Sequence, residues 1–513
     1  MVEQSAFDVV IVGGGPGGYP AAIRAAQYGL RVALIEKERV GGVCLNWGCI
    51  PTKAMLRSAD VLETMQHAAD FGVLADNVRL DYPAVLKRKD TIVKGLTDGV
   101  GQLLKTNGVT VYAGHARFTA PMVLDVVGVG TSPLGAGGPL YNAPSDGVGQ
   151  PKARVAARHV IIATGSTPAQ LPIPGADLPG VINSDGAFML PEVPKRIVIV
   201  GGGAAGTEWA TMFSAFGSEV TLVELLPSLL PLEDEDMGRT LNRSFTRRGM
   251  KVLTSSTVAK IEAGANKKSA ALRVTITDKD GKNEQTVDAD NVLIGVSRRP
   301  NTLDLNLETT GVQTDKRGYI TVDDQLRTNV HNVFAIGDVV GRIQLAHVAT
   351  HMGLIAAGVI AGHDEKMDYK AVPAATFTHP EVASVGLSEA KAREAGHDVV
   401  IGKFPFVALG RAQTYGNTDG LIKIVADKKY GEVLGVHIIG PSASDLIPEG
   451  VLALQLEATL EDIANTIHAH PTLGEGSMEA AMVALGLPVH VGPSRRAAAS
   501  TSRPAEPAAA AAR

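Results

Sequence analysis

The chain has 513 residues, of which 45% are hydrophobic and 20% charged, with a net charge of −5 and two cysteines. This length predicts two to four domains. The composition is that of a soluble globular enzyme. The chain has no basic footprint for nucleic acid and no apolar run of the ~18 residues that a membrane helix needs. Its first residues lack the pattern of a signal or transit peptide, so we expect no targeting leader. Two cysteines favour a reducing cytoplasm, and they are too few for a zinc site unless histidines join them.

The first predicted element is a short buried strand of mostly β-branched residues at 7–12. The sequence GGGPGG follows, and its three key positions are filled by Gly13, Gly15 and Gly18. Glycines at these positions allow a tight turn, close approach to a pyrophosphate and packing of helix on strand. A second strand at 31–35 ends at Glu36, where a carboxylate can bind ribose hydroxyls. This order of elements predicts a bound dinucleotide.

The segment GGVCLNWGCIPTK at 41–53 contains both cysteines, Cys44 and Cys49. On a regular helix, residues five apart lie about 8.6 Å apart, which exceeds the ~7 Å limit for α-carbons bridged by a disulfide. A disulfide here therefore needs an irregular turn, for which Gly48 and Pro51 are suitable residues. Because strained disulfides are easily reduced, this spacing suits a redox pair better than a structural disulfide. The alternative is two buried free thiols that behave as small hydrophobes.

Four further segments follow different patterns. Residues 51–106 have a helical pattern with lysines and acids, whereas the Gly/Pro-rich residues 128–152 predict a flexible surface excursion between strands. The sequence VIIATGS at 160–166 predicts a strand that runs into a turn of small residues. The similar VFAIGD at 333–338 ends at Asp338, which could bind a cofactor's polyol or serve as a loop acid or helix cap.

A second strand–glycine–helix–strand unit begins at residue 195. Its glycine positions are filled by Gly201, Gly203 and Gly206. The following strand at 220–223 leads to Glu224, which favours a free ribose 2′-hydroxyl. Residues 225–227 include no arginine for a 2′-phosphate, so the unit predicts NAD rather than NADP. The alternative is that one of the two units is a structural relic.

The C-terminal part has four strand-like segments, at 382–386, 401–406, 421–426 and 432–439, which suggest an antiparallel sheet with helices. The sequence HAHPTLGEG then brings His470 and Glu475 together. A histidine oriented by a carboxylate can act as a general base, although a surface histidine near a helix start is the simpler interpretation. The Ala/Pro/Ser-rich tail predicts disorder.

These motifs together resemble those of the pyridine nucleotide–disulfide oxidoreductases, from about residue 7 to 489. Within that family the chain is most similar to the dihydrolipoamide dehydrogenases. The resemblance implies an α/β fold with two Rossmann-like dinucleotide-binding domains and a C-terminal α+β dimerisation domain. Its cofactors would be FAD and NAD, with no metal. The domains would be FAD-binding (1–168), NAD-binding (169–298), FAD-binding or central (299–365) and interface (366–489), followed by a tail (490–513).

The resemblance also assigns site residues. The expected FAD contacts are Gly13, Gly15, Gly18, Glu36, Ala116, Thr164, Gly165, Ser166, Asp338 and Ala346, with Lys53 near the flavin and paired with Glu208. The expected NAD contacts are Gly201, Gly203, Gly206, Glu224, Val258 and Ser297, the last of which stands where the family usually has glycine. Cys44 and Cys49 would form the redox disulfide, with His470 as base and Glu475 as its partner.

The implied function is oxidation of dihydrolipoamide to lipoamide with reduction of NAD. The enzyme would be a homodimer in which His470 of one chain serves the disulfide of the other. Its partner would be the lipoyl domain of the acyltransferase subunit in a 2-oxoacid dehydrogenase complex, with no nucleic acid or membrane. The rival interpretations are another flavin disulfide reductase, of the glutathione or mercuric ion type, and a non-catalytic assembly subunit.

Overall fold

The structure is a computed structural model that describes residues 4–128, 151–264 and 271–492. Nearly all of the predicted excursion at 128–152 and of the tail at 490–513 therefore lies outside the described residues. The chain forms two compact units, one of residues 1–227 with 249–369 and one of residues 228–248 with 370–513. Among the described residues, no helix is long and apolar enough to cross a membrane.

The larger sheet of the first unit has the strand order β3–β2–β1–β6–β5–β4, with β17 beside β6. Its strands are β1 (Gln4–Val12), β2 (Val32–Glu36), β3 (Thr110–Ala113), β4 (His115–Ala120), β5 (Val123–Val127), β6 (Pro151–Ile162) and β17 (Val333–Ala335). The neighbours β1, β2, β3, β6 and β17 pair in parallel, and β4 and β5 pair antiparallel. The apolar run of β1 is almost completely buried, as expected for a parallel strand covered on both faces.

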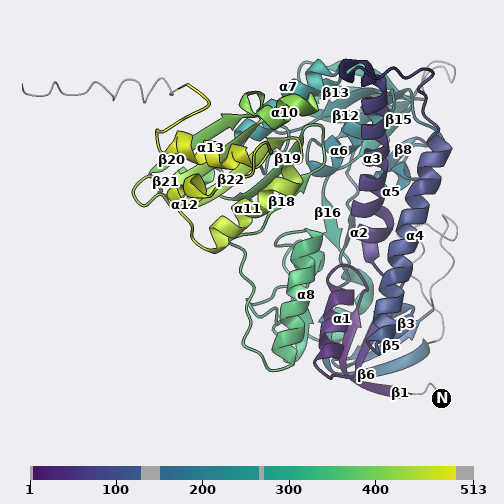
Figure 1. Ribbon diagram of the computed structural model, residues 1–513. Helices are drawn as coiled ribbons and strands as arrows, with labels where there is room; N and C mark the ends of the chain where they lie inside the picture. The colour runs from purple at the N-terminus through teal and green to yellow at the C-terminus, as the bar shows by residue number, and fades with distance from the viewer. Residues whose placement is uncertain (1–3, 129–150, 265–270, 493–513) are drawn as a thin grey trace, which may run out of the picture. The chain divides into compact units, whose positions relative to one another are not determined.

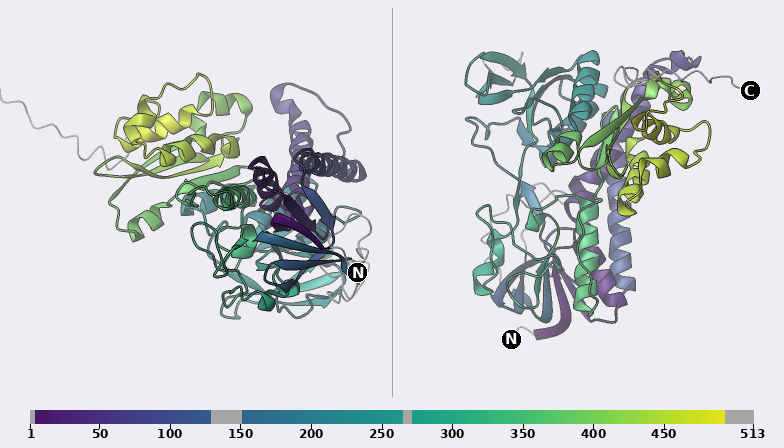
Figure 2. Two further views of the ribbon diagram at one scale, coloured as in Figure 1. Left: turned by 90° about the horizontal axis from the view of Figure 1, so that it is seen from below. Right: turned by 90° about the vertical axis from the view of Figure 1, so that its left-hand side faces the viewer.

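The helices of this unit follow its motifs closely. Helix α1 (Gly18–Gln27) starts in the first glycine turn, and α8 (Ala346–Ile360) lies beside it (Figures 1 and 2). The two backbones are so close that a Cβ on Gly353 would lie 2.3 Å from Gly17 O. The predicted helical region contains α3 (Cys49–Gln66) and α4 (Tyr82–Thr106), which pack together.

The second sheet of this unit repeats the dinucleotide-binding pattern. Its strands are all parallel, in the order β11–β10–β9–β15–β8. They are β8 (Val181–Asn183), β9 (Arg196–Val200), β10 (Glu219–Val223), β11 (Lys251–Leu253) and β15 (Asn291–Ile294), with α6 (Ala204–Ala215) after β9. Beside this sheet lie the antiparallel strands β12 (Ser256–Ala263), β13 (Leu272–Asp278) and β14 (Gln285–Ala289), and the pair β7 (Ser166–Pro168) and β16 (Arg298–Pro300).

The second unit is built on an antiparallel sheet of order β18–β19–β22–β21–β20. Its strands are β18 (Ala374–Thr376), β19 (Glu381–Gly386), β20 (Val399–Pro405), β21 (Leu421–Asp427) and β22 (Val433–Gly440). Its helices are α7 (Glu235–Arg247), α9 (Glu389–Glu394), α10 (Gly410–Tyr415), α11 (Ala443–Gln455), α12 (Leu460–Asn465) and α13 (Glu475–Ala484). The four predicted strands are present, and the predicted fold class is confirmed.

Helix α7 belongs to this second unit, although its residues lie inside the predicted NAD-binding domain at 169–298. The physical reason is a buried ion-pair cluster. Lys423 on β21 contacts Asp234 at 2.8 Å and Asp236 at 2.8 Å, and Glu389 Oε2 lies 3.0 Å away. The predicted domain limits stay a prediction.

Candidate active site

The first glycine turn has the geometry of a nucleotide cradle. Gly13 has φ +104°, and a Cβ there would lie 2.4 Å from Ala163 O. A Cβ on Gly18 would lie 1.8 Å from Gly13 O, so this position needs glycine for packing. At Gly15, by contrast, the nearest atom to a Cβ is 3.8 Å away. The chain itself does not require glycine there, which is the expected pattern where a phosphate approaches the backbone.

Glu36 closes this cradle. Its carboxylate accepts hydrogen bonds from Gly14 N–H at 2.6 Å and from Glu38 N–H at 2.7 Å. Burial raises the pKa of Glu36, although these two N–H donors oppose that effect. The Gly14 N–H group therefore holds the predicted acid at the glycine turn, and the Glu38 N–H group holds it from the segment that follows β2.

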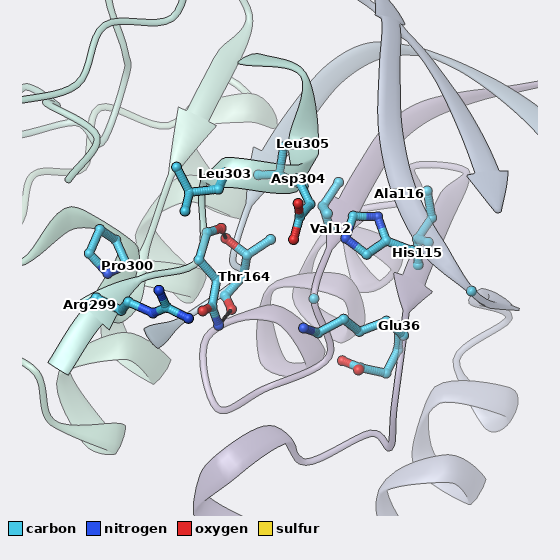
Figure 3. Close-up of a pocket in the computed structure, with 15 residues that line it drawn as sticks. Val12, Glu36, His115, Ala116, Thr164, Arg299, Pro300, Leu303, Asp304 and Leu305 are labelled. Carbon is cyan, nitrogen blue, oxygen red and sulfur yellow. Dashed lines mark hydrogen bonds between the residues drawn. The ribbon is translucent and has the colours of Figure 1, made fainter. Parts of the chain in front are cut away.

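A pocket of about 120 Å³ opens beside this acid (Figure 3). It is lined by the predicted residues Gly13, Glu36, Ala116 and Thr164. Other residues that line the pocket were not predicted from the sequence, including Lys37, His115, Arg299, Asn301 and Asp304. His115 adjoins the predicted Ala116, and Arg299 and Asn301 follow the predicted Ser297, so both motifs gave a partial signal.

The two small-residue turns meet at one polar network. Ser166 Oγ donates to Asp338 Oδ2 at 2.6 Å, and Arg298 Nε donates to Ser166 Oγ at 2.6 Å. Arg298 also donates to Ser166 O at 2.7 Å, and its Nε lies 3.8 Å from Asp338 Oδ2. The predicted residues Ser166 and Asp338 are thus brought together, with Arg298 as an unpredicted third member.

The second glycine turn repeats the first. Gly201 has φ +108°, and a Cβ on Gly206 would lie 1.8 Å from Gly201 O. A Cβ on Gly203 would meet nothing within 4 Å. Glu224 accepts from Gly202 N–H at 2.5 Å and from Leu226 N–H at 2.7 Å, as Glu36 does in the first turn. Both turns therefore retain nucleotide-binding geometry.

The two remaining residues predicted to contact NAD, Val258 and Ser297, have different surroundings. Val258 is 5% exposed and packs in the hydrophobic core beside the second sheet, so its side chain serves packing. Ser297 has φ +61°, a left-handed conformation that glycine adopts more easily. Its carbonyl accepts a hydrogen bond from Ala169 N–H at 3.2 Å, which ties β16 to β7.

The cysteines lie on either side of a helix break. Cys44 is in α2 (Gly42–Trp47) and Cys49 begins α3, with Gly48 between the two helices at φ −133° and ψ −108°. A Cβ on Gly48 would lie 2.9 Å from Val43 O, which is too close for an ordinary side chain. Thr52 then donates to Gly48 O at 2.6 Å. The predicted irregular turn is therefore present.

The two thiols are free and half-buried. The Cys44 thiol donates a hydrogen bond to Cys49, which raises the pKa of Cys44 and lowers that of Cys49. The positive charge of Lys53 also lowers the pKa of Cys49. Lys53 Nζ lies 2.8 Å from both oxygens of Glu208, so the predicted pair is present. Cys49 is thus the thiol prepared to be a thiolate.

In the second unit, His470 and Glu475 form a second pair of acid–base groups. His470 Nδ1 lies 2.8 Å from Glu475 Oε1, and Glu475 Oε2 accepts from Thr472 N–H at 2.8 Å. Burial raises the pKa of Glu475, but the bonds from Thr472 and His470 bring it below its ordinary value. The side chain of His470 is 79% exposed, so the imidazole is oriented and accessible.

Comparison with known proteins agrees with this geometry. Residues 7–353 match the family model of the pyridine nucleotide-disulphide oxidoreductases, and residues 372–481 match the dimerisation domain of the same family. The chain belongs to the pyridine nucleotide-disulphide oxidoreductase family. The predicted FAD and NAD cofactors and the oxidoreductase class are confirmed, and the dimerisation domain supports the predicted homodimer.

Individual relatives are similar over nearly the whole chain. Dihydrolipoyl dehydrogenase of Chlamydia muridarum is 41% identical, covering 96% of this chain and 100% of its own. That of Geobacillus stearothermophilus is 43% identical, covering 94% and 97%. Among solved structures, LpdA of Mycobacterium tuberculosis has a TM-score of 0.81 at 26% identity, covering 92% and 99%. A flavoprotein disulfide reductase of Escherichia coli, RclA, has a TM-score of 0.78 at 28% identity, also covering 92% and 99%.

Proposed function

We propose that the chain is a dihydrolipoyl dehydrogenase, which oxidises dihydrolipoamide and reduces NAD. The single observation that supports this most is the pair of half-buried thiols, Cys44 and Cys49, on the two sides of the break at Gly48, with Lys53 one turn further along the same helix as Cys49. Such a pair can exchange with a dithiol and leave one sulfur as a thiolate. The relatives at 40–43% identity that carry this name support the same substrate.

The residues present fit both nucleotides. The open positions at Gly15 and Gly203 leave room for a pyrophosphate, and the carboxylates of Glu36 and Glu224, each held at its glycine turn, would accept hydrogen bonds from ribose hydroxyls. Ser166 and Asp338 would hold the polyol of FAD. When bound, FAD would supply the two-electron acceptor for the thiol pair, and NAD would supply the final hydride acceptor.

Side chains of the protein itself would perform the thiol–disulfide exchange. His470 Nε2 takes the proton of one substrate thiol, while Glu475 holds the imidazole through Nδ1. The resulting thiolate attacks Cys44 Sγ of the oxidised pair, the Cys44–Cys49 bond breaks, and Cys49 leaves as a thiolate. The second substrate thiol then attacks the substrate sulfur of the mixed disulfide. Cys44 is released as a thiol, and the substrate closes into its cyclic disulfide.

We place this reaction between two chains of a homodimer. The exposed His470 would act on the thiol pair of the partner, so a monomer would have no complete site. The lipoyl domain of a 2-oxoacid dehydrogenase complex would deliver the substrate. A cytoplasmic location stays a prediction.

The test is a steady-state assay of the flavin-loaded protein with free dihydrolipoamide and NAD. We expect NADH formation that is lost in Cys44→Ser. A preference for NADP would overturn the interpretation of Glu224. Faster turnover with NADPH and oxidised glutathione would instead support a glutathione-type reductase. A purified protein without flavin and without thiol-dependent turnover would contradict the proposal.

A further inference from the structure

Arg298 is held in place by the backbone around it. It lies in β16, which pairs antiparallel with β7 and places Arg298 opposite Pro168. Just beyond this strand, Asn301 N–H donates to Gly165 O at 3.0 Å, and Asn301 Nδ2 donates to Thr164 O at 2.9 Å. The chain returning from the second nucleotide unit is therefore tied to the small-residue turn of the first unit.

Three side chains at this junction form a hydrogen-bonded relay, which runs from Arg298 through Ser166 to Asp338. A guanidinium group has N–H donors and no acceptor, so the 2.6 Å contact of Arg298 Nε with Ser166 Oγ uses an oxygen lone pair of the serine. The single hydroxyl hydrogen of Ser166 is then donated to Asp338 Oδ2 at 2.6 Å. Ser166 is 1% exposed, so water does not compete for that hydrogen.

The relay occupies one oxygen of Asp338 and leaves the other open. Oδ2 accepts from Ser166 and lies 3.8 Å from Arg298 Nε. Oδ1 accepts no hydrogen bond from the described residues, and it is not one of their fully buried unpaired atoms. The Asp338 side chain is 25% exposed, so Oδ1 can be reached by a ligand. A carboxylate with one oxygen fixed and the other open is prepared to accept a hydrogen bond from a hydroxyl group.

We propose that Arg298 is a positioning residue for FAD, which acts through Ser166 to orient Asp338 so that Oδ1 accepts a hydrogen bond from a hydroxyl group of the FAD polyol. This inference rests on the assignment of Asp338 to the polyol in the proposed function, and it is independent of the dihydrolipoamide substrate. The chain segment that follows β15 of the second sheet thus supplies the group that prepares the FAD site.

The test compares the binding of FAD and of ADP to the full-length protein after its flavin has been removed. FAD binding is measured by the change in flavin fluorescence, and ADP is measured as a competitor of FAD. ADP contains the part of FAD assigned to the first glycine turn and to Glu36, but it has no polyol. The rate of FAD release from the flavin-loaded protein checks the same effect without removal of the flavin.

Arg298→Met should raise the dissociation constant of FAD by about tenfold or more, as expected for a lost hydrogen bond to a charged group. The competition constant of ADP should stay unchanged, because ADP does not reach Asp338. Unchanged FAD affinity would overturn the proposal. Equal losses for FAD and ADP would assign Arg298 a structural role and would also overturn it. Arg158→Met, which removes an exposed arginine beside Asp8 in the same unit, is the matched control and should leave FAD affinity unchanged.

Two further variants locate the effect within the relay. Ser166→Ala interrupts the relay at its middle and should raise the dissociation constant of FAD by a similar factor, and adding Arg298→Met should raise it no further. Additive losses would show that the two residues act independently and would overturn the relay. Unchanged FAD affinity in Asp338→Ala would overturn the assignment of Asp338 and the inference with it. A loss confined to Asp338→Ala would overturn the role of Arg298 alone.

Discussion

Lys53 Nζ contacts both carboxylate oxygens of Glu208 at 2.8 Å, and so links the helix that begins with Cys49 to the helix of the second nucleotide unit. The Glu208 side chain is 8% exposed and that of Lys53 31% exposed, so the pair is partly shielded from water. The Lys53 charge lowers the pKa of the neighbouring Cys49 thiol, and the Glu208 charge partly opposes this effect.

The first prediction concerns that charge. Because Lys53 lowers the pKa of Cys49, Lys53→Met should raise it, and Cys49 should become reactive at higher pH. The measurement is the pH dependence of iodoacetamide alkylation at Cys49 in the reduced protein, read by mass spectrometry. Lys94→Met, which removes an exposed lysine of α4, should leave the profile unchanged. A profile that is unchanged in Lys53→Met would contradict the role of Lys53.

The second prediction concerns the imidazole. His470→Gln should lower kcat with dihydrolipoamide by ~10²–10⁴-fold, the usual contribution of a general base. NADH oxidation by an artificial electron acceptor should be retained, because that reaction needs no thiol deprotonation. His490→Gln is a matched control, since His490 is also exposed and also holds a carboxylate, Glu479, through Nδ1. An equal loss in both variants would remove His470 from its assigned role.

The third prediction separates packing from ligand binding in the second glycine turn. Gly203→Ala has space for its methyl group, so the protein should fold normally but show a higher KM for NAD. Gly206→Ala would place its methyl group 1.8 Å from Gly201 O and should destabilise the fold. Melting temperature and NADH formation distinguish the two effects. A Gly203→Ala variant with a normal KM would mean that no phosphate approaches this turn.

The fourth prediction concerns Ser297. A non-glycine residue at positive φ costs on the order of 1 kcal/mol, so Ser297→Gly should raise the free energy of unfolding by up to about that amount, less the entropy that glycine loses. Ser58→Gly, inside α3, should instead lower it by roughly 0.5–1 kcal/mol. Urea unfolding measures both. Equal destabilisation by the two substitutions would show that the Ser297 side chain stabilises its turn.

The fifth prediction concerns the cluster around Lys423, whose side chain is 3% exposed. Lys423→Met leaves the carboxylates of Asp234, Asp236 and Glu389 without their shared cation. The expected loss is about 3–5 kcal/mol at pH 7, as for a broken buried ion pair. Lys428→Met, which breaks an exposed pair with Asp398, should cost less than about 1 kcal/mol.

The same cluster makes the stability of the fold depend on pH, and the pKa of Asp236 determines the direction of that dependence. Burial would raise the pKa of Asp236, but hydrogen bonds from Lys403 and Lys423 lower it to about 2. A carboxyl with a lowered pKa stabilises the fold above its unfolded pKa of about 3.8 and loses that contribution as pH falls toward 2. Wild-type stability should therefore fall between pH 4 and pH 2, whereas the deficit of Lys423→Met should shrink as its unpaired carboxylates protonate. A deficit that stays constant with pH would contradict this account.

The sequence was informative where a function depends on neighbouring residues. The glycine turns, Glu36 and Glu224, the break at Gly48 and the pairing of His470 with Glu475 all lie within short segments, and each was predicted. These features depend on backbone dihedrals and local spacing, which a short sequence determines almost alone.

Contacts between distant segments were harder to predict. The link from Arg298 to Ser166 spans 132 residues, and that from Ser166 to Asp338 spans 172. Arg298 has no sequence signal of its own, because an arginine in a strand can face solvent or a partner equally well.

The membership of α7 in the second unit has a practical consequence for dissecting the molecule. A fragment that begins at residue 370 would lack Asp234 and Asp236. Of the carboxylates that contact the buried Lys423 ammonium group in the described part of the chain, it would keep Glu389 alone. An isolated C-terminal fragment would therefore need residues 228–248 joined to it, for example in a circularly permuted protein.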